Sequence, residues 1–260
     1  MKPYPHIYLS PHLDDGVLSC GGRIWQQAQA GERVLVVTVF ASAPPLDAPL
    51  SPFAQELHAR WEHPDDAITR RRDEDLAALA RLGAEAAHWP YADCIYRQTS
   101  DGRHPYASEE ALWGEVHPAE KSLVTELATR ITALPLAPGG AIYAPLGVGR
   151  HVDHQIVRQA ASDAWALAMA EWTPTYYEDF PYAEDWPEVQ AALGEGRWQV
   201  EKVPLSEESL VARVEAVACY RSQLSTFWAG AAEMAAAVRA FAEQVGDGEP
   251  AERYWKPTSP

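Results

Sequence analysis

Two short segments of the chain combine histidine and aspartate in a pattern that suits metal binding. The first segment reads SPHLDDG and contains His12 and Asp15, which lie three residues apart. The second reads RHVDH and contains His151 and His154 at the same spacing. On a turn that enters a helix, residues with this spacing share a face. Three ligands drawn from histidine and carboxylate, with water in the fourth position, form a catalytic zinc site, so the pattern predicts metal-assisted hydrolysis.

Each segment also carries a second carboxylate, at Asp14 and at Asp153. Because they adjoin the histidines and Asp15 in sequence, these two carboxylates point to neighbouring positions. From there a carboxylate can accept a proton or orient a histidine. A simpler interpretation makes Asp14 and Asp15 a helix N-cap with favourable dipole placement. The same interpretation makes His151 and His154 solvated residues of a first helical turn. We favour the metal site, because the simpler interpretations must all hold at once at one place in the fold.

The elements around both segments predict a Rossmann-like α/β fold. Residues 7–10 and 141–144 form short strands directly before the two segments, and residues 34–40, VLVVTVF, form a buried strand. Strands alternate with helices, which predicts a mostly parallel sheet with helices on both faces, in a single domain over residues 1–260. Parallel strands end at one edge, so the two segments can converge there.

The remaining predicted elements follow from periodicity, turn residues and caps. Helices are predicted at residues 17–30, 67–82, 118–134, 151–170, 207–223 and 230–244, strands at 86–89 and 198–203, long loops at 41–66 and 90–117, and a polar tail after the last helix.

Composition and charge exclude several partner classes. The 260 residues include 21 Lys+Arg and 37 Asp+Glu, a net charge of −16. Nucleic acids and anionic membranes require basic surfaces, so we expect neither as a partner. We find no signal peptide and no apolar stretch near the roughly 18 residues of a membrane span. Three scattered cysteines without a CxxC pair predict a reduced, cytoplasmic protein whose metal site uses no thiolates.

The two segments together resemble the motifs of the LmbE-like or PIG-L family of zinc-dependent N-acetyl-sugar deacetylases. The family motif HPDDE stands here as HLDDG at residues 12–16, and the motif HPDH stands as HVDH at residues 151–154. The resemblance spans about residues 7–160, and YEDFPY at residues 177–182 also looks familial. A weaker family element matches Arg71, Glu74, Ala78, Leu82 and Gly83.

The resemblance implies a role for each motif residue. Asp14 would be the general base. His151 would be the cationic group that faces the tetrahedral intermediate, with Asp153 orienting it. Arg71 and Asp93 would contact hydroxyl or phosphate groups of the substrate, although taken alone they read as a solvated helix charge and an ordinary loop residue. One zinc ion per chain would be held by His12, Asp15 and His154.

The chain departs from the family pattern at two positions. Leu13 replaces the motif proline, which changes the rigidity of the turn rather than its chemistry. Gly16 replaces the motif glutamate, so a carboxylate that organises the site is missing or supplied elsewhere. This second change bears on substrate scope more than on metal binding.

We therefore expect a hydrolase that removes acetyl from a small N-acetylated amino sugar or sugar conjugate of the N-acetylglucosaminyl type. One alternative is a metal-dependent amidase or esterase that acts on a non-sugar acyl group. A second alternative, motivated by Gly16, is a metal-binding protein that no longer catalyses. A homo-oligomer is compatible with the sequence, which does not fix the number of subunits.

Overall fold

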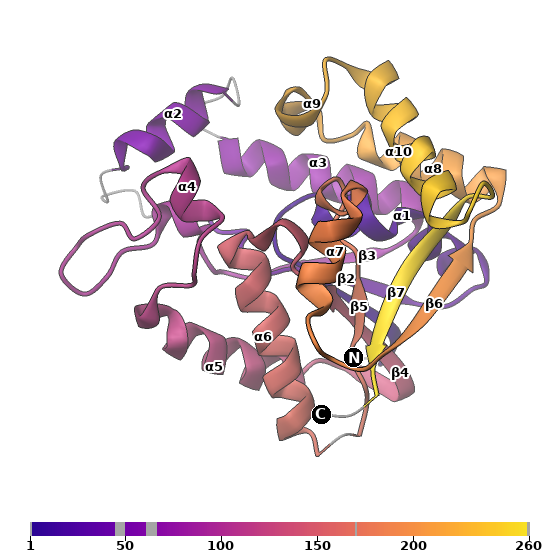
Figure 1. Cartoon of the computed structure of the whole chain (residues 1–260), viewed down its shortest axis with the longest axis horizontal. Coiled ribbons are helices and arrows are strands. Elements are labelled where there is room, and N and C mark those ends of the chain that lie inside the picture. The colour runs from indigo at the N-terminus through magenta and orange to yellow at the C-terminus, as the bar shows by residue number, and fades with distance from the viewer. Residues whose placement is uncertain (1, 45–49, 61–66, 170, 259–260) are drawn as a thin grey trace.

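Seven strands form one sheet in the order β3-β2-β1-β4-β5-β7-β6 (Figure 1). The computed structural model describes residues 2–44, 50–60, 67–169 and 171–258. Strands β3, β2, β1, β4 and β5 are parallel, and β7 runs antiparallel to β5 and β6. The predicted mostly parallel α/β sheet is confirmed. The strands are β1 (Tyr4–Ser10), β2 (Val34–Thr38), β3 (Glu85–His88), β4 (Leu136–Pro145), β5 (Thr175–Tyr177), β6 (Trp198–Pro204) and β7 (Ala251–Pro257).

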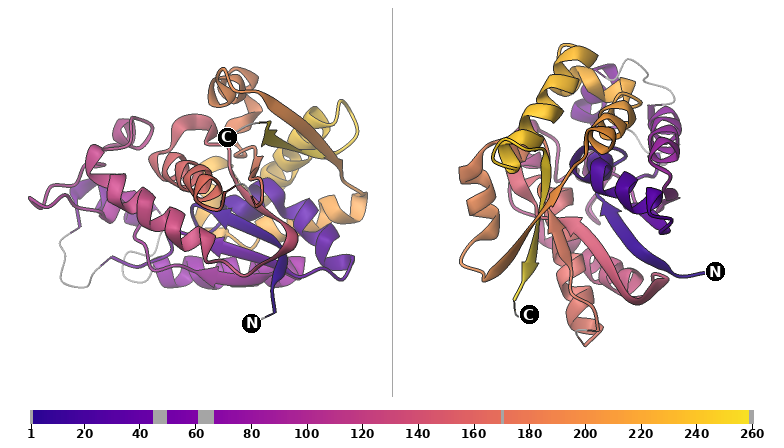
Figure 2. Two further views of the ribbon diagram at one scale, coloured as in Figure 1. Left: turned by 90° about the horizontal axis from the view of Figure 1, so that it is seen from below. Right: turned by 90° about the vertical axis from the view of Figure 1, so that its right-hand side faces the viewer.

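Helices cover both faces of this sheet (Figures 1 and 2). Helices α1, α3 and α8 pack against one another on one face, and α5 and α6 pack together on the other. The helices are α1 (Asp15–Gln29), α2 (Pro52–Arg60), α3 (Ala67–Leu82), α4 (Glu109–Leu112), α5 (Lys121–Thr132), α6 (Val152–Leu167), α7 (Trp186–Leu193), α8 (Glu207–Val217), α9 (Arg221–Phe227) and α10 (Ala231–Val245). In the described parts of the chain, no helix is both long and apolar enough to cross a bilayer.

The order of the strands places a crevice between β1 and β4. From β1 the chain proceeds outward to β2 and β3, and it then returns to pair β4 with the other side of β1. Ligands of open α/β sheets bind at such a switch point, beyond the carboxyl ends of the strands. Because β1 ends at Ser10 and β4 ends at Pro145, both chemistry-bearing segments emerge at this point.

The predicted polar tail is wrong, because residues 251–257 form β7 inside the antiparallel part of the sheet. Its sequence, AERYWKP, hides this role because charged residues interrupt the apolar ones. Tyr254 is fully buried, and the buried carboxylate of Glu252 accepts hydrogen bonds from the backbone N–H groups of Gly22 and Arg23. Contacts with residues distant in the sequence therefore bury and pair the polar side chains of a strand whose composition is typical of an exposed segment.

Other predicted boundaries also change. The helix predicted at residues 207–223 is divided into α8 and α9, because the hydroxyl of Tyr220 donates a 2.7 Å hydrogen bond to Asp75 and holds the break in place. Strand β4 extends well beyond the predicted residues 141–144. Helices α2 and α4 lie in the two predicted long loops, and α7 and β5 were not predicted at all. Residues 45–49, 61–66, 170 and 259–260 of the predicted elements lie outside the described residues.

Candidate active site

A tight turn after β1 presents the first segment to the crevice. The Ser10 hydroxyl donates to the carbonyl of His12 at 2.6 Å and accepts the N–H of Gly16 at 2.9 Å. The carboxylate of Asp15 accepts the backbone N–H of His12 at 2.8 Å. The carboxylate of Asp14 makes no capping hydrogen bond to helix α1, and it lines the cavity instead. The N-cap interpretation therefore does not account for the Asp14 side chain.

A second turn, after β4, brings back the HVDH segment. Gly147 and Gly149 both adopt φ of +78°, the left-handed region that favours glycine. A Cβ atom at Gly149 would also lie 2.9 Å from the Tyr182 side chain. Between them, the backbone N–H of Val148 donates a 2.9 Å hydrogen bond to the carboxylate of Asp179. This turn starts helix α6 at the sheet edge, facing the first segment.

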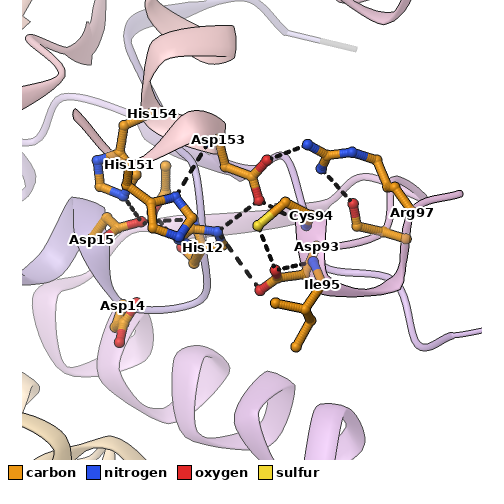
Figure 3. Close-up of polar contacts among 12 residues, drawn as sticks. His12, Asp14, Asp15, Asp93, Cys94, Ile95, Arg97, His151, Asp153 and His154 are labelled. Atoms are coloured by element: carbon orange, nitrogen blue, oxygen red, sulfur yellow. Dashed lines mark hydrogen bonds and ion pairs between the residues drawn. The ribbon is translucent and has the colours of Figure 1, made fainter. Parts of the chain in front are cut away.

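The three residues predicted as metal ligands lie together (Figure 3). Oδ2 of Asp15 is 3.2 Å from Nδ1 of His12 and 3.3 Å from Nε2 of His154. Zinc binds nitrogen and oxygen at about 2.0–2.2 Å, so two ligand atoms of a tetrahedral site lie about 3.3 Å apart. The donor types, and the two separations from Asp15, suit a divalent metal such as zinc.

Both histidines of this set carry a carboxylate on their other ring nitrogen. His12 Nε2 is 3.0 Å from Oδ2 of Asp153, and His154 Nδ1 is 2.7 Å from Oδ1 of Asp179. Metal-binding histidines are commonly held in this way, because the outer hydrogen bond fixes the tautomer and the ring orientation. Asp179 was not assigned a role from the sequence, although the YEDFPY segment that contains it was noticed.

Replacing Asp179 with asparagine is expected to weaken metal binding about 10- to 100-fold, the usual cost of removing a carboxylate behind a ligand histidine. The asparagine keeps the size of the side chain but loses the charge that orients His154. Metal dissociation constants for the wild type and the variant, measured by competition with a chelator, test this. Equal constants would show that His154 needs no negative charge at its Nδ1 partner.

The carboxylate of Asp153 lies on His12 rather than on His151, which corrects the predicted pairing. It accepts hydrogen bonds from Arg97 Nη2 at 2.6 Å and from the backbone N–H of Cys94 at 3.0 Å, in addition to its contact with His12. His151 Nδ1 instead accepts the backbone N–H of Asp153 at 3.3 Å. Arg97 comes from a long loop with no motif, so this contact could not be predicted from the sequence.

His151 begins helix α6 and its ring lies near both ligand histidines. Because Nδ1 accepts a hydrogen bond, the ring proton is assigned to Nε2, which makes this nitrogen a donor. The ring of His151 also meets Trp113 edge to face, with centroids 5.2 Å apart. Other arrangements of donors exist among the described residues. In three groups, single ligand atoms lie within 4.8 Å of one another: His12, His151 and His154; His12, Asp93 and Asp153; and Cys94, His151 and Asp153.

Burial and neighbouring charges shift the pKa values of the site residues strongly. Burial opposes the charged form of His154, but the carboxylates of Asp15 and Asp179 outweigh burial and raise the pKa of His154 to about 10. Burial likewise disfavours ionised Asp15, but the charge of His154 and the hydrogen bonds from His12 hold its pKa well below the usual range. Burial and the positive charge of His12 lower the pKa of His151 well below its ordinary value.

Asp14 has a different environment from Asp15. Burial and the negative charge of Asp15 raise the pKa of Asp14 to about 6, against the opposing charge of Arg71. Nη2 of Arg71 lies 3.9 Å from Oδ1 of Asp14. A carboxylate with a pKa near the working pH is suited to both accepting and returning a proton.

The donor set opens into a cavity of about 140 Å³. Arg71 and Asp93, the predicted substrate contacts, both line it, and Oδ2 of Asp93 is 3.7 Å from His12 Nε2. Much of the remaining wall is apolar or aromatic and includes Leu57, Ile95, Leu112, Trp113, Tyr182 and Phe227. Of these, only Tyr182, in the YEDFPY segment, and Trp113, as a loop aromatic, stand out in the sequence. Aromatic faces of this kind stack on the apolar faces of sugar rings.

Gly16 packs tightly beneath the turn. A Cβ atom at Gly16 would lie 3.3 Å from Cβ and Oγ of Ser10 and 3.5 Å from Cγ1 of Val36. A glutamate at this position would need these neighbours to shift. The donor atoms of His12, Asp15 and His154 come together without it.

The sequence profile of PIG-L, the GlcNAc-PI de-N-acetylases, matches residues 7–165, which is more than half of the chain. The chain belongs to the PIG-L family. The resemblance drawn from the HLDDG and HVDH motifs is thereby confirmed, as is the prediction of a hydrolase from a family that cleaves amide C–N bonds.

Several deacetylases are similar to this PIG-L protein. The 2'-N-acetylparomamine deacetylase of Niallia circulans is 26% identical over 75% of this chain and 72% of its own length. The enzyme of the same name from Streptomyces fradiae is 30% identical over 74% of this chain and 63% of its own length. The structure of the zinc-inhibited form of teicoplanin deacetylase Orf2 superposes with a TM-score of 0.83 and 32% identity, over 96% of this chain and 97% of that one.

Proposed function

We propose that the protein is a metal-dependent N-deacetylase that removes acetyl from an N-acetylated amino sugar or sugar conjugate of the N-acetylglucosaminyl type. The observation that carries the proposal is the position of Asp15 Oδ2, at 3.2 Å from His12 Nδ1 and 3.3 Å from His154 Nε2. Each of these histidines is backed by a carboxylate. One zinc ion per chain suits this donor set.

The metal and the other residues of the crevice have separate roles in this reaction. Zinc held by this set would supply Lewis acidity for the amide carbonyl and lower the pKa of a bound water. Asp14, whose carboxylate faces the same cavity, accepts the proton of the attacking water and returns it to the leaving amine. The amide C–N bond breaks, and acetate and the free amino sugar are released.

His151 serves in this proposal as the hydrogen-bond donor to the oxygen of the tetrahedral intermediate. The backbone N–H of Asp153 occupies its Nδ1, so Nε2 carries the proton and the ring needs no positive charge to donate. This replaces the imidazolium that we expected from the sequence. A positioned donor of this kind acts mainly on the transition state.

Replacing His151 with alanine is therefore expected to lower kcat by about 10²- to 10³-fold while changing KM little. Metal content should stay at the wild-type level, because the proposed ligands are untouched. Steady-state kinetics and elemental analysis of the same preparation test both points. Loss of the metal in this variant would favour the set of three histidines over the set that contains Asp15.

The walls of the cavity support a sugar as the substrate. Trp113, Tyr182 and Phe227 offer ring faces, while Arg71 and Asp93 offer polar contacts to hydroxyl groups. The similar enzymes named above act on N-acetylparomamine and on teicoplanin, which agrees with an amino-sugar conjugate.

Acetate release from a matched panel of substrates tests the substrate class. The panel contains N-acetylglucosamine conjugates, N-acetyl amides without a sugar, and acetyl esters. We expect turnover of the sugar conjugates at a kcat/KM at least tenfold above the other two classes. Faster cleavage of a non-sugar amide or ester would replace the proposal with a general metal-dependent amidase or esterase. Zinc binding without turnover of any member would favour a protein that only binds metal.

We also propose a cytoplasmic protein without a nucleic-acid or membrane partner. The net charge of −16 supports this part, and all three cysteines are free thiols.

A further inference from the structure

A second cavity lies further along helix α6, between that helix and strands β5, β6 and β7. Its volume is about 400 Å³, larger than the cavity at the metal-ligand set. The two cavities share no lining residue. The second cavity therefore needs an explanation of its own.

The guanidinium of Arg158 enters this cavity without a carboxylate partner. Its Cζ atom is 6.0 Å from the ring centroids of both Tyr176 and Trp198. Over the described ranges, no carboxylate lies within ion-pair distance of the partly buried Arg158, whereas Arg97, Arg213 and Arg253 each have one. A cation that loses part of its hydration is stabilised by an anionic partner.

The charged groups that face Arg158 do not neutralise it. Asp179 and Tyr176 act on it from a distance, and burial outweighs them and lowers its pKa. Asp163, on the next turn of α6, accepts a 2.7 Å hydrogen bond from Gln159. The positive charge of Arg158 is therefore left for a ligand.

A second donor beside the cavity is also unsatisfied. The indole N–H of Trp165, a residue that is 6% exposed, lies beneath the cavity wall and has no hydrogen-bond partner among the described residues. Buried donors of this kind are nearly always paired in folded proteins. The side-chain amides of Gln155 and Gln159 already donate to Gly114 and Asp163, which leaves their oxygens as acceptors for ligand hydroxyls.

We propose that this cavity binds a sugar ring that carries an anionic group. The carboxylate or phosphate accepts hydrogen bonds from Arg158, since guanidinium pairs well with both anions, and from Trp165 after a small shift of the cavity wall exposes its N–H. The ring lies against the aromatic side chains of Tyr176 and Trp198, and its hydroxyls donate to the glutamine oxygens. The site is separate from the proposed deacetylation and does not depend on it.

Binding of methyl glucuronide and methyl glucoside, measured by calorimetry on the full chain, tests the proposal. These ligands differ only in the carboxylate. We expect saturable binding of the glucuronide, about tenfold or more tighter than the glucoside. Glucose 6-phosphate distinguishes a phosphate site from a carboxylate site. Absence of saturable binding for both anionic ligands would overturn the proposal.

Three variants locate the binding. R158Q should weaken binding of the anionic ligand about tenfold or more, and W165F, which keeps an aromatic ring but loses the N–H, should weaken it several-fold. R239Q removes an equal charge from an exposed arginine paired with Glu207, and it should bind as the wild type does. Unchanged binding in both R158Q and W165F would contradict the assignment. Thermal unfolding and acetate release confirm that each variant is folded, and W165F decides the question if R158Q does not fold.

Discussion

Alanine at His12, Asp15 or His154 is expected to remove the bound metal and the deacetylase activity together. Each substitution deletes one of three donor atoms, two of which lie 3.2 and 3.3 Å from the third. A site left with two protein ligands loses most of its affinity, so each variant should retain well under a tenth of the wild-type metal after dialysis. Elemental analysis and acetate release on the same samples provide the two readouts.

The control for this series is Asp93→Ala. Asp93 also lines the cavity and lies 3.7 Å from His12, but it is not one of the proposed donors. The Asp93→Ala variant should keep its metal. Full metal occupancy in all three ligand variants would show that the donor set is wrong. If the alanine variants of His12, His151 and His154 lose the metal while the Asp15 variant keeps it, the three histidines are the ligands instead.

Asp14→Asn is expected to separate catalysis from metal binding. The substitution keeps the size of the side chain and removes its ability to accept a proton, so kcat should fall by roughly 10²- to 10⁴-fold with the metal retained. Asp14 is suited to this role because burial and Asp15 raise its pKa to about 6. Rapid-quench or steady-state acetate release, together with metal analysis, measures both quantities.

Asp93→Asn is the matched control for this second prediction, since it changes another buried carboxylate of the same cavity by the same chemistry. Its effect should fall mainly on KM, in line with a contact to substrate hydroxyls. A near wild-type kcat in the Asp14 variant would move the proton acceptor to another group. A larger kcat loss in the Asp93 variant than in the Asp14 variant would identify Asp93 as that group.

The parts of the fold that follow from local sequence were predicted well. Helix α3 has the predicted bounds, Ala67–Leu82, because Gly83 adopts φ of +75° and stops it. Strand β2 is a run of β-branched residues interrupted only by Leu35, and all of its residues are buried. Strand β7 was not predicted, because its charged residues are satisfied only by partners distant in the chain, such as Glu252 with the backbone of Gly22.

The same distinction applies to the site. The resemblance of HLDDG and HVDH to the family motifs suggested His12, Asp15 and His154 as ligands, and these three side chains lie together in the structure. The partners behind them could not be predicted, because Asp179 is 25 residues from His154 and Arg97 is 56 residues from Asp153. Contacts at such distances depend on how the loops return to the sheet edge, and no local pattern encodes that.

Acetate release from an N-acetylglucosamine conjugate, before and after removal of the metal, tests the central claim most directly. The purified protein is treated with a chelator, dialysed and assayed. It is assayed again after one equivalent of zinc per chain is restored. Cobalt and excess zinc are added in parallel samples, because a zinc-inhibited form exists for a similar enzyme. We predict turnover in the metal-replete protein, a loss of at least 100-fold after chelation, and recovery on adding one equivalent of a divalent metal. Unchanged acetate release by the metal-free protein would contradict the account.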